Sequence, residues 1–377
     1  ARLPTPGVIM ASDPVRVGII GCGSVMQGPY MAQLERLRGR GEAEVVVACD
    51  LDPTRGPLVR ERFGIPRFSA DADAVIGADD VDLVLVLTSI AAHGSLAAAA
   101  LRAGKHVLVE KPMATDLETG RELLALAREH DRLLVCAPHI VLSPTYQAIW
   151  RLVRAGTLGR PHAARARYGW AGPDWDEWFY SASGGALFDI AMYNITALTG
   201  LLGPVRRVVA MTGIAIAQRT AGGSVATVEA EDNAQLLLDH GHGVLSSVTA
   251  GFTMQQTRSP AIEVYGAEGT VQLLGDDWAP QGYDLWTRPV GAWRHYKDLN
   301  PGWLWTDGLR HVVECIRDGR PPVIWPEHAF HVLEVVIRAR EASATGIAQA
   351  VTSSFEDLDL GVAEADEPVH LRHNLRR

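Results

Sequence analysis

Residues 103–114 read Ala-Gly-Lys-His-Val-Leu-Val-Glu-Lys-Pro-Met-Ala and carry the clearest structural signal in the chain. The apolar run at residues 106–109 lies between a glycine and a proline, which predicts a short strand buried on both faces. The charged pair Glu110 and Lys111 follows where this strand ends. Because the carboxyl ends of the strands of an open parallel sheet face the ligand crevice, Lys111 is expected to point into that crevice.

Strands and helices alternate on both sides of this stretch. Apolar runs predict further strands at residues 15–20, 44–49, 83–87 and 133–136. Helices are predicted at residues 27–38, 53–63, 71–76, 93–102 and 116–130. Asp116 is expected to cap the last of these helices at its N-terminus. This alternation predicts an α/β fold that begins with a doubly wound parallel sheet of the Rossmann type.

The pattern changes from Pro138 onward, where strand-like runs follow one another without helices between them. These runs occupy residues 163–168, 205–216, 232–238, 244–252, 261–265, 270–274 and 283–286. Helices are predicted at residues 144–155, 304–317 and 327–344, and residues 183–189 are predicted to open another helix that runs to Leu202. The polar stretch at residues 218–224 is predicted to be a mobile loop. Consecutive strands favour a largely antiparallel sheet, so the second half is predicted to be an α+β domain.

Composition limits the classes of function. A chain of 377 residues is long enough for two domains. The net charge of -9 and the absence of a dense Lys/Arg block argue against a nucleic-acid partner. No apolar run reaches the roughly 18 residues of a membrane-spanning helix, so no membrane partner is predicted. The four cysteines show no paired spacing, which favours a reduced, cytoplasmic protein.

A glycine-containing loop follows the first predicted strand and precedes a helix. Its candidate cofactor-binding residues are Gly21, Gly23, Ser24 and Val25. In this setting the two glycines allow a tight turn and the close approach of a dinucleotide pyrophosphate. Met26 occupies the third glycine position, so a plain turn between strand and helix explains the loop about as well.

Asp50 ends the second predicted strand, where a carboxylate can accept hydrogen bonds from an adenosine ribose. Leu51 and Asp52 follow, and no adjacent base is present to meet a 2'-phosphate. The sequence therefore favours NAD over NADP as cofactor.

In this order, the landmarks resemble the Gfo/Idh/MocA oxidoreductase family. They are the Gly21 loop, Asp50, Thr88 and Ser89 with His93, the Glu110-Lys111-Pro112 motif, and Gly184-Gly185 followed by Asp189. The resemblance spans nearly the whole chain. It implies a Rossmann domain, a C-terminal domain with an open, largely antiparallel sheet, a nicotinamide cofactor and a sugar or cyclitol substrate. It also implies a homodimer or homotetramer built on the open face of that sheet.

Carried over to this chain, the resemblance makes Lys111 the catalytic lysine and Asp189 the aspartate of the family's Asp-x-Gly-x-His pattern. Tyr193 stands in place of the histidine, as in members similar to glucose-fructose oxidoreductase and dihydrodiol dehydrogenase. Asp189 and Tyr193 are four residues apart, so on a helix they share one face. An unperturbed phenol stays protonated near neutrality and suits orientation better than the role of base. The alternative role for Asp189 is a helix N-cap after two glycines.

The candidate site residues divide between the cofactor and the substrate. The residues expected to bind the cofactor are Gly21, Gly23, Ser24, Val25, Asp50, Thr88, Ser89, His93, Glu110 and Lys111. Substrate contacts are expected from His139, Trp175 and Tyr193, although a tryptophan in such a loop is about as often packing. His139 stands near Val141, which replaces an arginine of the family. No metal site is predicted, because His240 and His242 suit a hairpin turn and His328 and His331 lack zinc-protease spacing.

The sequence and the resemblance together predict an NAD(P)-dependent dehydrogenase or reductase that acts on a sugar, cyclitol or glycoside. Two alternatives are an NAD-dependent enzyme that cleaves glycosides through transient oxidation and a non-catalytic ligand-sensing regulator. The expected organisation is a flexible tail at residues 1–13, a dinucleotide-binding domain at residues 14–137, and a substrate-binding and oligomerisation domain at residues 138–377.

Overall fold

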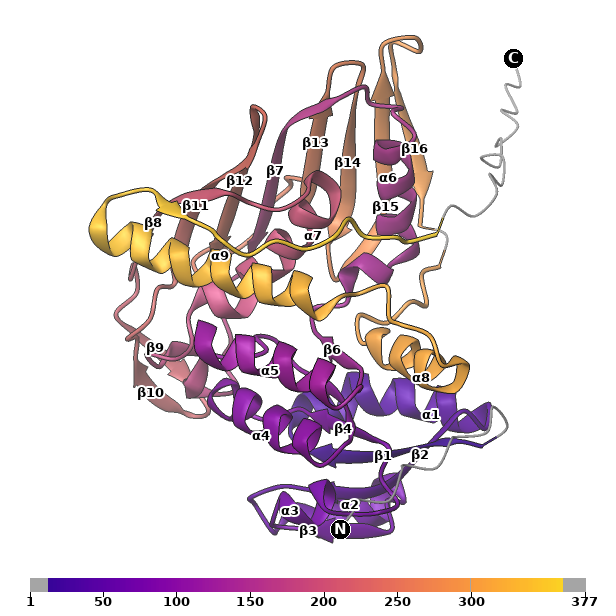
Figure 1. Cartoon of the computed structure of the whole chain (residues 1–377). Coiled ribbons are helices and arrows are strands. Elements are labelled where there is room, and N and C mark those ends of the chain that lie inside the picture. The colour runs from indigo at the N-terminus through magenta and orange to yellow at the C-terminus, as the bar shows by residue number, and fades with distance from the viewer. Residues whose placement is uncertain (1–12, 299, 362–377) are drawn as a thin grey trace, which may run out of the picture.

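The computed structural model describes residues 13–298 and 300–361. Within these residues the main strands form two sheets, one above the other in Figure 1, with helices packed between and around them. The predicted tail at residues 1–13 lies outside the described residues except for its last residue. No helix in the described part of the chain has the length and apolar character needed to cross a membrane.

The N-terminal sheet is parallel throughout. Its strands, in spatial order, are β3 (Arg67–Ser69), β2 (Ala43–Cys49), β1 (Val15–Ile20), β4 (Leu83–Val86), β5 (His106–Val109) and β6 (Leu134–Cys136). The helices that connect them are α1 (Met31–Gly39), α2 (Arg55–Phe63), α3 (Asp73–Ile76), α4 (Ile90–Arg102) and α5 (Leu117–Glu129). Every residue of β4 is buried, as expected for a strand covered on both faces. The predicted doubly wound parallel sheet is confirmed.

The helix after the glycine loop is irregular where a regular one was predicted. It opens with a π-helical turn, η1 (Met26–Tyr30), that contains Pro29. A proline has no N–H to donate and its ring crowds the preceding turn, which accounts for the widened turn before α1. Met26, at the third glycine position, is fully buried in the core.

The C-terminal sheet is mixed and largely antiparallel. Its order is β16 (Trp293–Lys297), β15 (Ala279–Thr287), β14 (Gly269–Asp276), β13 (Ile262–Gly266), β7 (Pro161–Gly169), β12 (Val244–Gly251), β11 (Asn233–Gly241), β8 (Arg207–Gly213) and β17 (Gln349–Ala350). The pair of β7 with β12 is parallel, and the other pairs in this sheet are antiparallel. The predicted fold class of the second half is confirmed.

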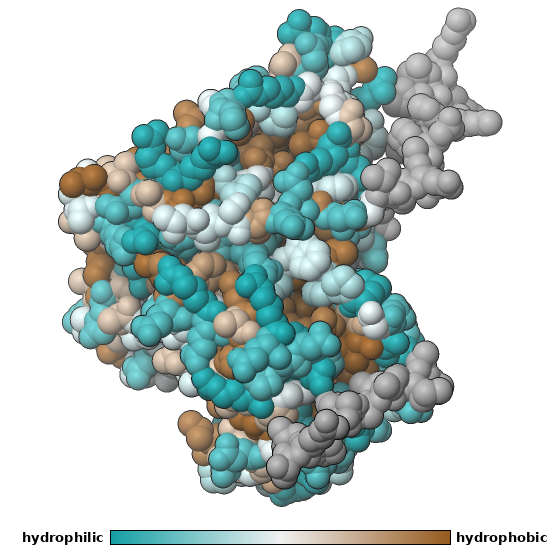
Figure 2. Space-filling view, viewed as in Figure 1, coloured by the Kyte–Doolittle hydropathy of each residue, from teal (hydrophilic) through white to brown (hydrophobic). Residues whose placement is uncertain are grey.

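One face of the C-terminal sheet is covered by helices and the other is open. The covering helices are α6 (Pro144–Arg154), α7 (Met192–Leu202) and α9 (Pro326–Thr345). Exposed apolar side chains on the strands β8, β11 and β12 belong to Val209, Met211, Leu237 and Leu245. The side viewed in Figure 2 is mostly hydrophilic over the helices, with hydrophobic residues visible between them.

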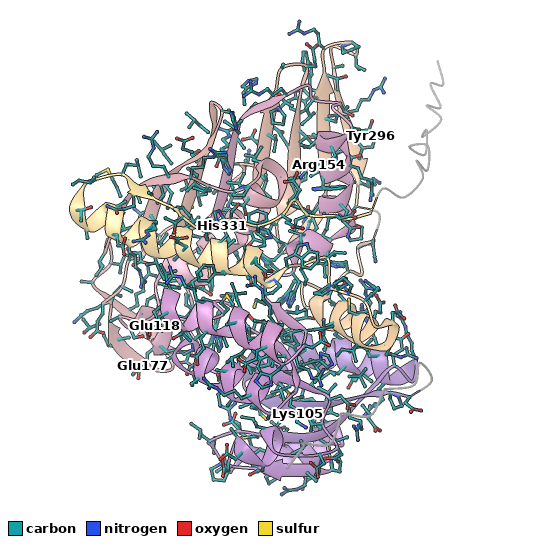
Figure 3. The ribbon with its side chains drawn as sticks, viewed as in Figure 1. Lys105, Glu118, Arg154, Glu177, Tyr296 and His331 are labelled. Atoms are coloured by element: carbon teal, nitrogen blue, oxygen red, sulfur yellow. The ribbon has the colours of Figure 1, made fainter. Side chains whose placement is uncertain are left out.

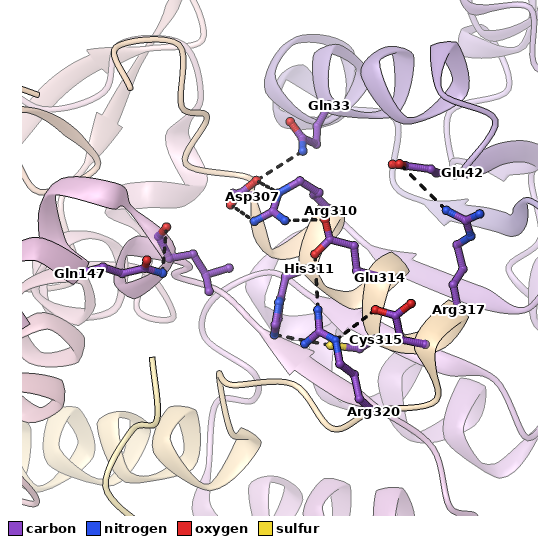
Figure 4. Close-up of polar contacts among 12 residues, drawn as sticks. Gln33, Glu42, Gln147, Asp307, Arg310, His311, Glu314, Cys315, Arg317 and Arg320 are labelled. Atoms are coloured by element: carbon purple, nitrogen blue, oxygen red, sulfur yellow. Dashed lines mark hydrogen bonds and ion pairs between the residues drawn. The ribbon is translucent and has the colours of Figure 1, made fainter. Parts of the chain in front are cut away.

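Two late helices pack back onto the N-terminal sheet. Helix α8 (Gly308–Asp318) contacts α1 and the strands β1, β5 and β6, and α9 contacts α5 and β6. Figure 4 shows polar contacts that join α8 to α1, among them Nε2 of Gln33 with Oδ1 of Asp307 at 3.5 Å. Arg310 also holds Asp307 through Nη2 at 2.7 Å. The two sheets therefore share a helical layer.

The polar stretch predicted as a mobile loop is ordered. It forms a hairpin of β9 (Gln218–Ala221) and β10 (Ser224–Thr227). Arg219 anchors the hairpin, because its guanidinium donates to the carbonyl oxygens of Ala171 and Phe252 and pairs with the buried Asp232. Asp232 also accepts the backbone N–H of Ala215, which accounts for β8 ending earlier than predicted.

Candidate active site

Lys111 and Asp189 meet in the region between the two sheets. Lys111 follows β5 at the carboxyl edge of the parallel sheet, and its Nζ lies 2.5 Å from Oδ1 of Asp189. The same ammonium donates to the backbone carbonyl oxygen of Asp189 at 2.8 Å. Each side chain is 12% exposed. The structure thus brings together the two residues that the sequence placed at the centre of the chemistry.

Asp189 is held by a second irregular turn. The π-helical turn η4 (Leu187–Ala191) precedes α7, and the backbone N–H of Asp189 donates to the carbonyl of Gly185. Asp189 therefore lies inside this turn and not at its N-cap. Gly185 has a φ of 94°, and a Cβ there would lie 2.6 Å from Oε1 of Glu231. This glycine is required by both its backbone conformation and its close neighbour.

Glu231 and Arg340 fix the turn that carries Asp189. Glu231 accepts the backbone N–H of Leu187 and pairs with Nη2 of Arg340 at 2.9 Å. Arg340 also donates to the carbonyl of Gly184 at 2.6 Å. No sequence motif marked this pair, because the residues lie far from Asp189 in the chain. They position the carboxylate that faces Lys111.

Tyr193 lies close to Lys111. The centroid of its ring is 5.5 Å from Nζ of Lys111, and its ring makes an edge contact with Tyr168 at 5.5 Å between centroids. Burial, with the nearby charge of Glu110, raises the pKa of Tyr193 well above its ordinary value. The phenol therefore stays protonated and can donate a hydrogen bond. Lys111, Asp189 and Tyr193 form one cluster, which we call the catalytic cluster.

Glu110 holds the backbone next to this cluster. Its carboxylate accepts a hydrogen bond from the hydroxyl of Tyr30 at 2.8 Å and from the backbone N–H of Lys111 at 3.0 Å. Tyr30 belongs to η1 and carried no sequence signal of its own. The contact ties the strand end that presents Lys111 to the helix after the glycine loop.

The glycine loop is a tight turn held at its base by Asp50. Gly21 has a φ of 98°, and a Cβ there would lie 2.5 Å from the carbonyl oxygen of Leu87. The backbone N–H of Cys22 donates to Oδ2 of Asp50 at 2.7 Å. Asp50 also accepts the N–H of Asp52, so its carboxylate is fixed at the end of β2. Ser24 is exposed beside this loop.

A basic side chain lies beside Asp50. The prediction that no adjacent base is present was therefore wrong. Arg55, in the first turn of α2, places Nη1 at 3.4 Å from Oδ2 of Asp50 and Nε at 3.6 Å from Oδ2 of Asp52. Its side chain is 34% exposed. Helix α2 follows β2 and brings Arg55 back to the carboxylates at the end of that strand. The spacing of these residues in the sequence did not show this contact.

His93 joins two loops at the edge of the parallel sheet. Helix α4 begins at Ile90, so His93 lies within the helix and does not open it as predicted. Its ring nitrogens lie 2.8 Å from the carbonyl oxygen of Pro112 and 3.0 Å from that of Thr88. Burial lowers the pKa of His93, so the ring is neutral and donates to one of these carbonyls. Its binding of the cofactor stays a prediction, as does that of the exposed Ser89.

The two other predicted substrate contacts differ in exposure. His139 is fully buried, and its ring packs against Gly308 at the start of α8. Trp175 is 54% exposed and stacks on Trp170 with 5.5 Å between ring centroids. Of these two side chains, Trp175 is accessible to a ligand and His139 is not.

The histidines for which the sequence predicted no metal role lie in structural contacts or turns. His240 contacts the carbonyl of Gly203 and the hydroxyl of Ser246, and His242 lies in the turn between β11 and β12. His331, labelled in Figure 3, accepts the backbone N–H of Val205 at 2.9 Å. Within the described residues no group of three or more His, Cys, Asp or Glu side chains is placed to hold a metal ion.

Asp277 is a buried carboxyl that had no sequence signal. It lies in the turn between β14 and β15 and accepts a hydrogen bond from Nδ2 of Asn194 at 2.8 Å. Burial, with the nearby charge of Asp276, raises its pKa to about 7. The contact links this turn to the residue that follows Tyr193.

We expect Asp277 to make stability depend on pH. Between about pH 4 and pH 7 the folded state keeps a proton that the unfolded state has lost, so the free energy of unfolding falls as pH rises and is constant above pH 7. A shift of about three pKa units corresponds to roughly 4 kcal/mol. Chemical denaturation should show Asp277→Asn more stable than the wild type at pH 8 and about equal at pH 4. Parallel pH profiles for the two proteins would contradict this expectation.

Two family models match the two halves of this chain. A model described as an oxidoreductase family with an NAD-binding Rossmann fold matches residues 15–137. A model of the GFO/IDH/MocA C-terminal domain matches residues 146–272. D-apiose dehydrogenase of Paraburkholderia graminis is 30% identical over 322 residues, which cover 81% of this chain and 81% of that protein.

Two further matches extend over most of the chain. The 1,5-anhydro-D-fructose reductase of Ensifer adhaerens is 26% identical over 353 residues, which cover 90% of this chain and 99% of that protein. The solved structure of levoglucosan dehydrogenase in complex with NADH and levoglucosan superposes with a TM-score of 0.80 at 20% identity. That match covers 90% of this chain and 100% of the other chain.

Proposed function

The chain belongs to the Gfo/Idh/MocA oxidoreductase family, and we propose that it transfers a hydride between NAD and a hydroxyl or keto carbon of a sugar, cyclitol or glycoside. The observation that carries the proposal is the contact between Lys111 and Asp189 at the carboxyl edge of the parallel sheet. Dehydrogenation of a secondary alcohol needs a group that takes the hydroxyl proton and a positive charge that stabilises the negative charge developing on the oxygen, which stays bound to the carbon. The catalytic cluster offers both within one contact.

The residues of the chain divide this work. A bound nicotinamide would supply the acceptor for the hydride that leaves the carbon carrying the hydroxyl group. Lys111 donates a hydrogen bond to that hydroxyl oxygen and stabilises its developing negative charge. Asp189 takes the proton, directly or through Lys111, and Tyr193 orients the substrate through its protonated phenol. In the direction of reduction the same groups return the proton.

The proposed cofactor site follows the carboxyl edge of the parallel sheet. The positive φ of Gly21 fits a loop whose backbone a pyrophosphate can approach, and Asp50, which the N–H of Cys22 holds at the end of β2, fits a ribose contact. The residues proposed to hold the cofactor are Gly21, Gly23, Ser24, Val25, Asp50, Thr88, Ser89, His93, Glu110 and Lys111. His139 and Trp175 are proposed as substrate contacts with Tyr193.

A panel of sugars, inositols and glycosides incubated with NAD tests the proposal. We expect NADH fluorescence to rise with at least one compound, with one NADH formed for each oxidised product. A glycoside cleaved without net NADH would favour the alternative in which the cofactor is regenerated in each turnover. Binding of a sugar without any reaction would favour the ligand-sensing regulator. Either outcome would overturn the proposal.

The charges around Asp50 give a prediction about the cofactor. The two negative charges of Asp50 and Asp52 exceed the single positive charge of Arg55. A 2'-phosphate is therefore repelled, and NAD should bind more tightly than NADP. Asp50→Ser removes one carboxylate and frees Arg55, so the ratio of the two affinities should shift toward NADP by roughly tenfold to a hundredfold. Calorimetric titration with NAD and NADP measures both constants without turnover.

A double variant isolates Arg55 in this experiment. Adding Arg55→Ala to Asp50→Ser should abolish most of the gain in NADP affinity. Adding Arg62→Ala, an exposed arginine near the end of α2, should leave the gain intact. An NADP affinity equal to or better than that for NAD in the wild type would contradict the assignment of Asp50.

The assembly and location of the protein remain proposals. Four exposed apolar residues on the open face of the C-terminal sheet support a homodimer or homotetramer formed through that face. The four cysteines in the described residues are unpaired and buried, which supports a cytoplasmic location. We also propose that residues 14–137 bind the dinucleotide and that residues 138–377 bind the substrate and form the oligomer.

A further inference from the structure

The hydroxyl of Tyr30 is buried next to the strand end that carries Lys111. Tyr30 is fully buried in η1, and its hydroxyl donates to Oε1 of Glu110 at 2.8 Å. Burial, with the nearby charge of Glu110, raises the pKa of Tyr30 well above its ordinary value, so the phenol stays protonated. Tyr30 is therefore a fixed hydrogen-bond donor, and the residue that accepts its hydrogen bond is the neighbour of Lys111 in the chain.

Glu110 uses both of its carboxylate oxygens to hold the residues around it. Oε1 accepts from the hydroxyl of Tyr30, and Oε2 accepts from the backbone N–H of Lys111 at 3.0 Å. Glu110 is 8% exposed, so little water reaches the carboxylate to replace either donor. A buried carboxylate oxygen that loses its donor costs free energy, which favours rotation of the side chain toward another partner. The orientation of Glu110, and with it the hold on the backbone of Lys111, therefore depends on Tyr30.

Lys111 is thereby held at two ends. Its ammonium donates to Oδ1 of Asp189 at 2.5 Å, and its backbone N–H donates to Glu110. The first contact orients the group that faces the proposed substrate, and the second fixes the backbone from which the side chain extends. A shift of this backbone would move Nζ away from the substrate hydroxyl, and a misplacement of about 1 Å in a site can lower the rate about a hundredfold.

The C-terminal half of the chain fixes the ring of Tyr30. In the segment between β16 and α8, the ring of Trp305 makes an edge contact with the ring of Tyr30, with 6.1 Å between the centroids. The hydroxyl of the buried Thr306 donates to the carbonyl oxygen of Pro29 at 3.2 Å. Because these contacts involve the ring and the neighbouring backbone, the position of the ring does not depend on its hydroxyl.

We propose that Tyr30 is a positioning residue for the reaction, which acts on Lys111 through Glu110 and touches neither the substrate nor the cofactor. The inference rests on the proposed function, since Lys111 is the group to which we assign the developing negative charge. The contacts form a chain from Trp305 through Tyr30 and Glu110 to the backbone of Lys111. The second half of the protein thus positions the lysine of the first half in two ways, through Asp189 and through Tyr30.

Tyr30→Phe tests this role, because it removes the hydroxyl and keeps the ring. With the best substrate of the sugar panel, kcat should fall about tenfold or more. KM for the sugar and the affinity for NAD should change by less than about twofold, because the variant alters the placement of Lys111 and no binding contact. Titration with NAD gives the affinity and counts the binding sites, so that kcat is expressed for each folded site.

Tyr146→Phe is the matched control. Tyr146 is also fully buried, and its hydroxyl donates to the carbonyl oxygen of Ala197 at 2.9 Å, so this variant loses a similar hydrogen bond elsewhere. It should keep the wild-type kcat. Wild-type kcat in Tyr30→Phe, an equal fall of kcat in both variants, or a loss of NAD affinity that makes Tyr30 a cofactor contact would each overturn the inference and leave the proposed function standing. A wild type that oxidises no compound of the panel would overturn both.

A double-mutant cycle tests the route through Glu110. Glu110→Leu is similar in size and offers no acceptor, so it removes the contact from the other side. In this background Tyr30→Phe should change kcat by less than about twofold, because the contact is already absent. A further fall of about tenfold in the double variant would show that Tyr30 affects the reaction independently of Glu110 and would overturn the assignment.

Discussion

Replacing Lys111 by alanine should lower kcat by roughly a hundredfold or more while leaving the affinity for NAD nearly unchanged. The reason is local, because Lys111 holds Asp189 through two contacts and supplies the positive charge of the catalytic cluster. Lys111 is one of the ten residues proposed to hold the cofactor, and the pyrophosphate and ribose contacts lie at the glycine loop and Asp50, which the substitution does not touch. Steady-state NADH formation gives kcat, and titration of the variant with NAD gives the affinity.

A second lysine provides the control. Lys297 is exposed on β16, so Lys297→Ala should retain wild-type kinetics. Lys105, labelled in Figure 3, is unsuitable because its ammonium donates to the carbonyl oxygens of Ala78 and Val81 and holds a turn of the Rossmann domain. Turnover like that of the wild type in Lys111→Ala would refute the proposed chemistry.

Removing the hydroxyl of Tyr193 should lower kcat/KM by about tenfold to a hundredfold. Burial keeps the phenol protonated, so it acts as a donor that orients the substrate and not as a base. Tyr193→Phe removes one active-site hydrogen bond, which corresponds to roughly 1.4 to 3 kcal/mol. The ring that contacts Tyr168 stays, so the fold and NAD affinity should survive. Kinetics on the best substrate of the sugar panel measure the effect.

Two further variants complete the test of this position. Tyr193→His should keep some activity if the family's histidine and this tyrosine are interchangeable. Tyr296→Phe, on the edge strand β16 (Figure 3), serves as the matched control and should leave kcat/KM unchanged. If Tyr193→Phe matches the wild type, Tyr193 is packing and the chemistry lies with Lys111 and Asp189.

Local sequence patterns predicted the elements that carry Lys111 and Asp189. A short apolar run between a glycine and a proline defines β5, and the carboxyl edge of a parallel sheet then determines where Lys111 lies. Two consecutive glycines marked the turn before Asp189. The π-helical form of that turn escaped prediction, because it depends on the backbone hydrogen bonds around Gly185 and the contacts of Glu231.

Features that arise from distant contacts escaped prediction. Arg55 reaches Asp50 only because α2 folds back over the end of β2, and the linear order of residues does not show this. The hairpin at residues 218–227 is polar and resembles a loop in sequence, yet Arg219 ties it to the buried Asp232. Tyr168 gained significance only through its contact with Tyr193. In each case the signal lies in tertiary packing and not in local periodicity.

The return of α8 and α9 to the parallel sheet has a consequence for biosynthesis. During translation the six parallel strands leave the ribosome long before these helices. Part of the apolar surface of the sheet therefore stays exposed until α8 and α9 pack on it. Gly120 of α5 shows how closely the cover fits, because a Cβ there would lie 2.8 Å from the ring of Phe330. The nucleotide-binding half is therefore completed by some of the last helices to be synthesised, and expressed alone it would present this surface to chaperones and to other chains.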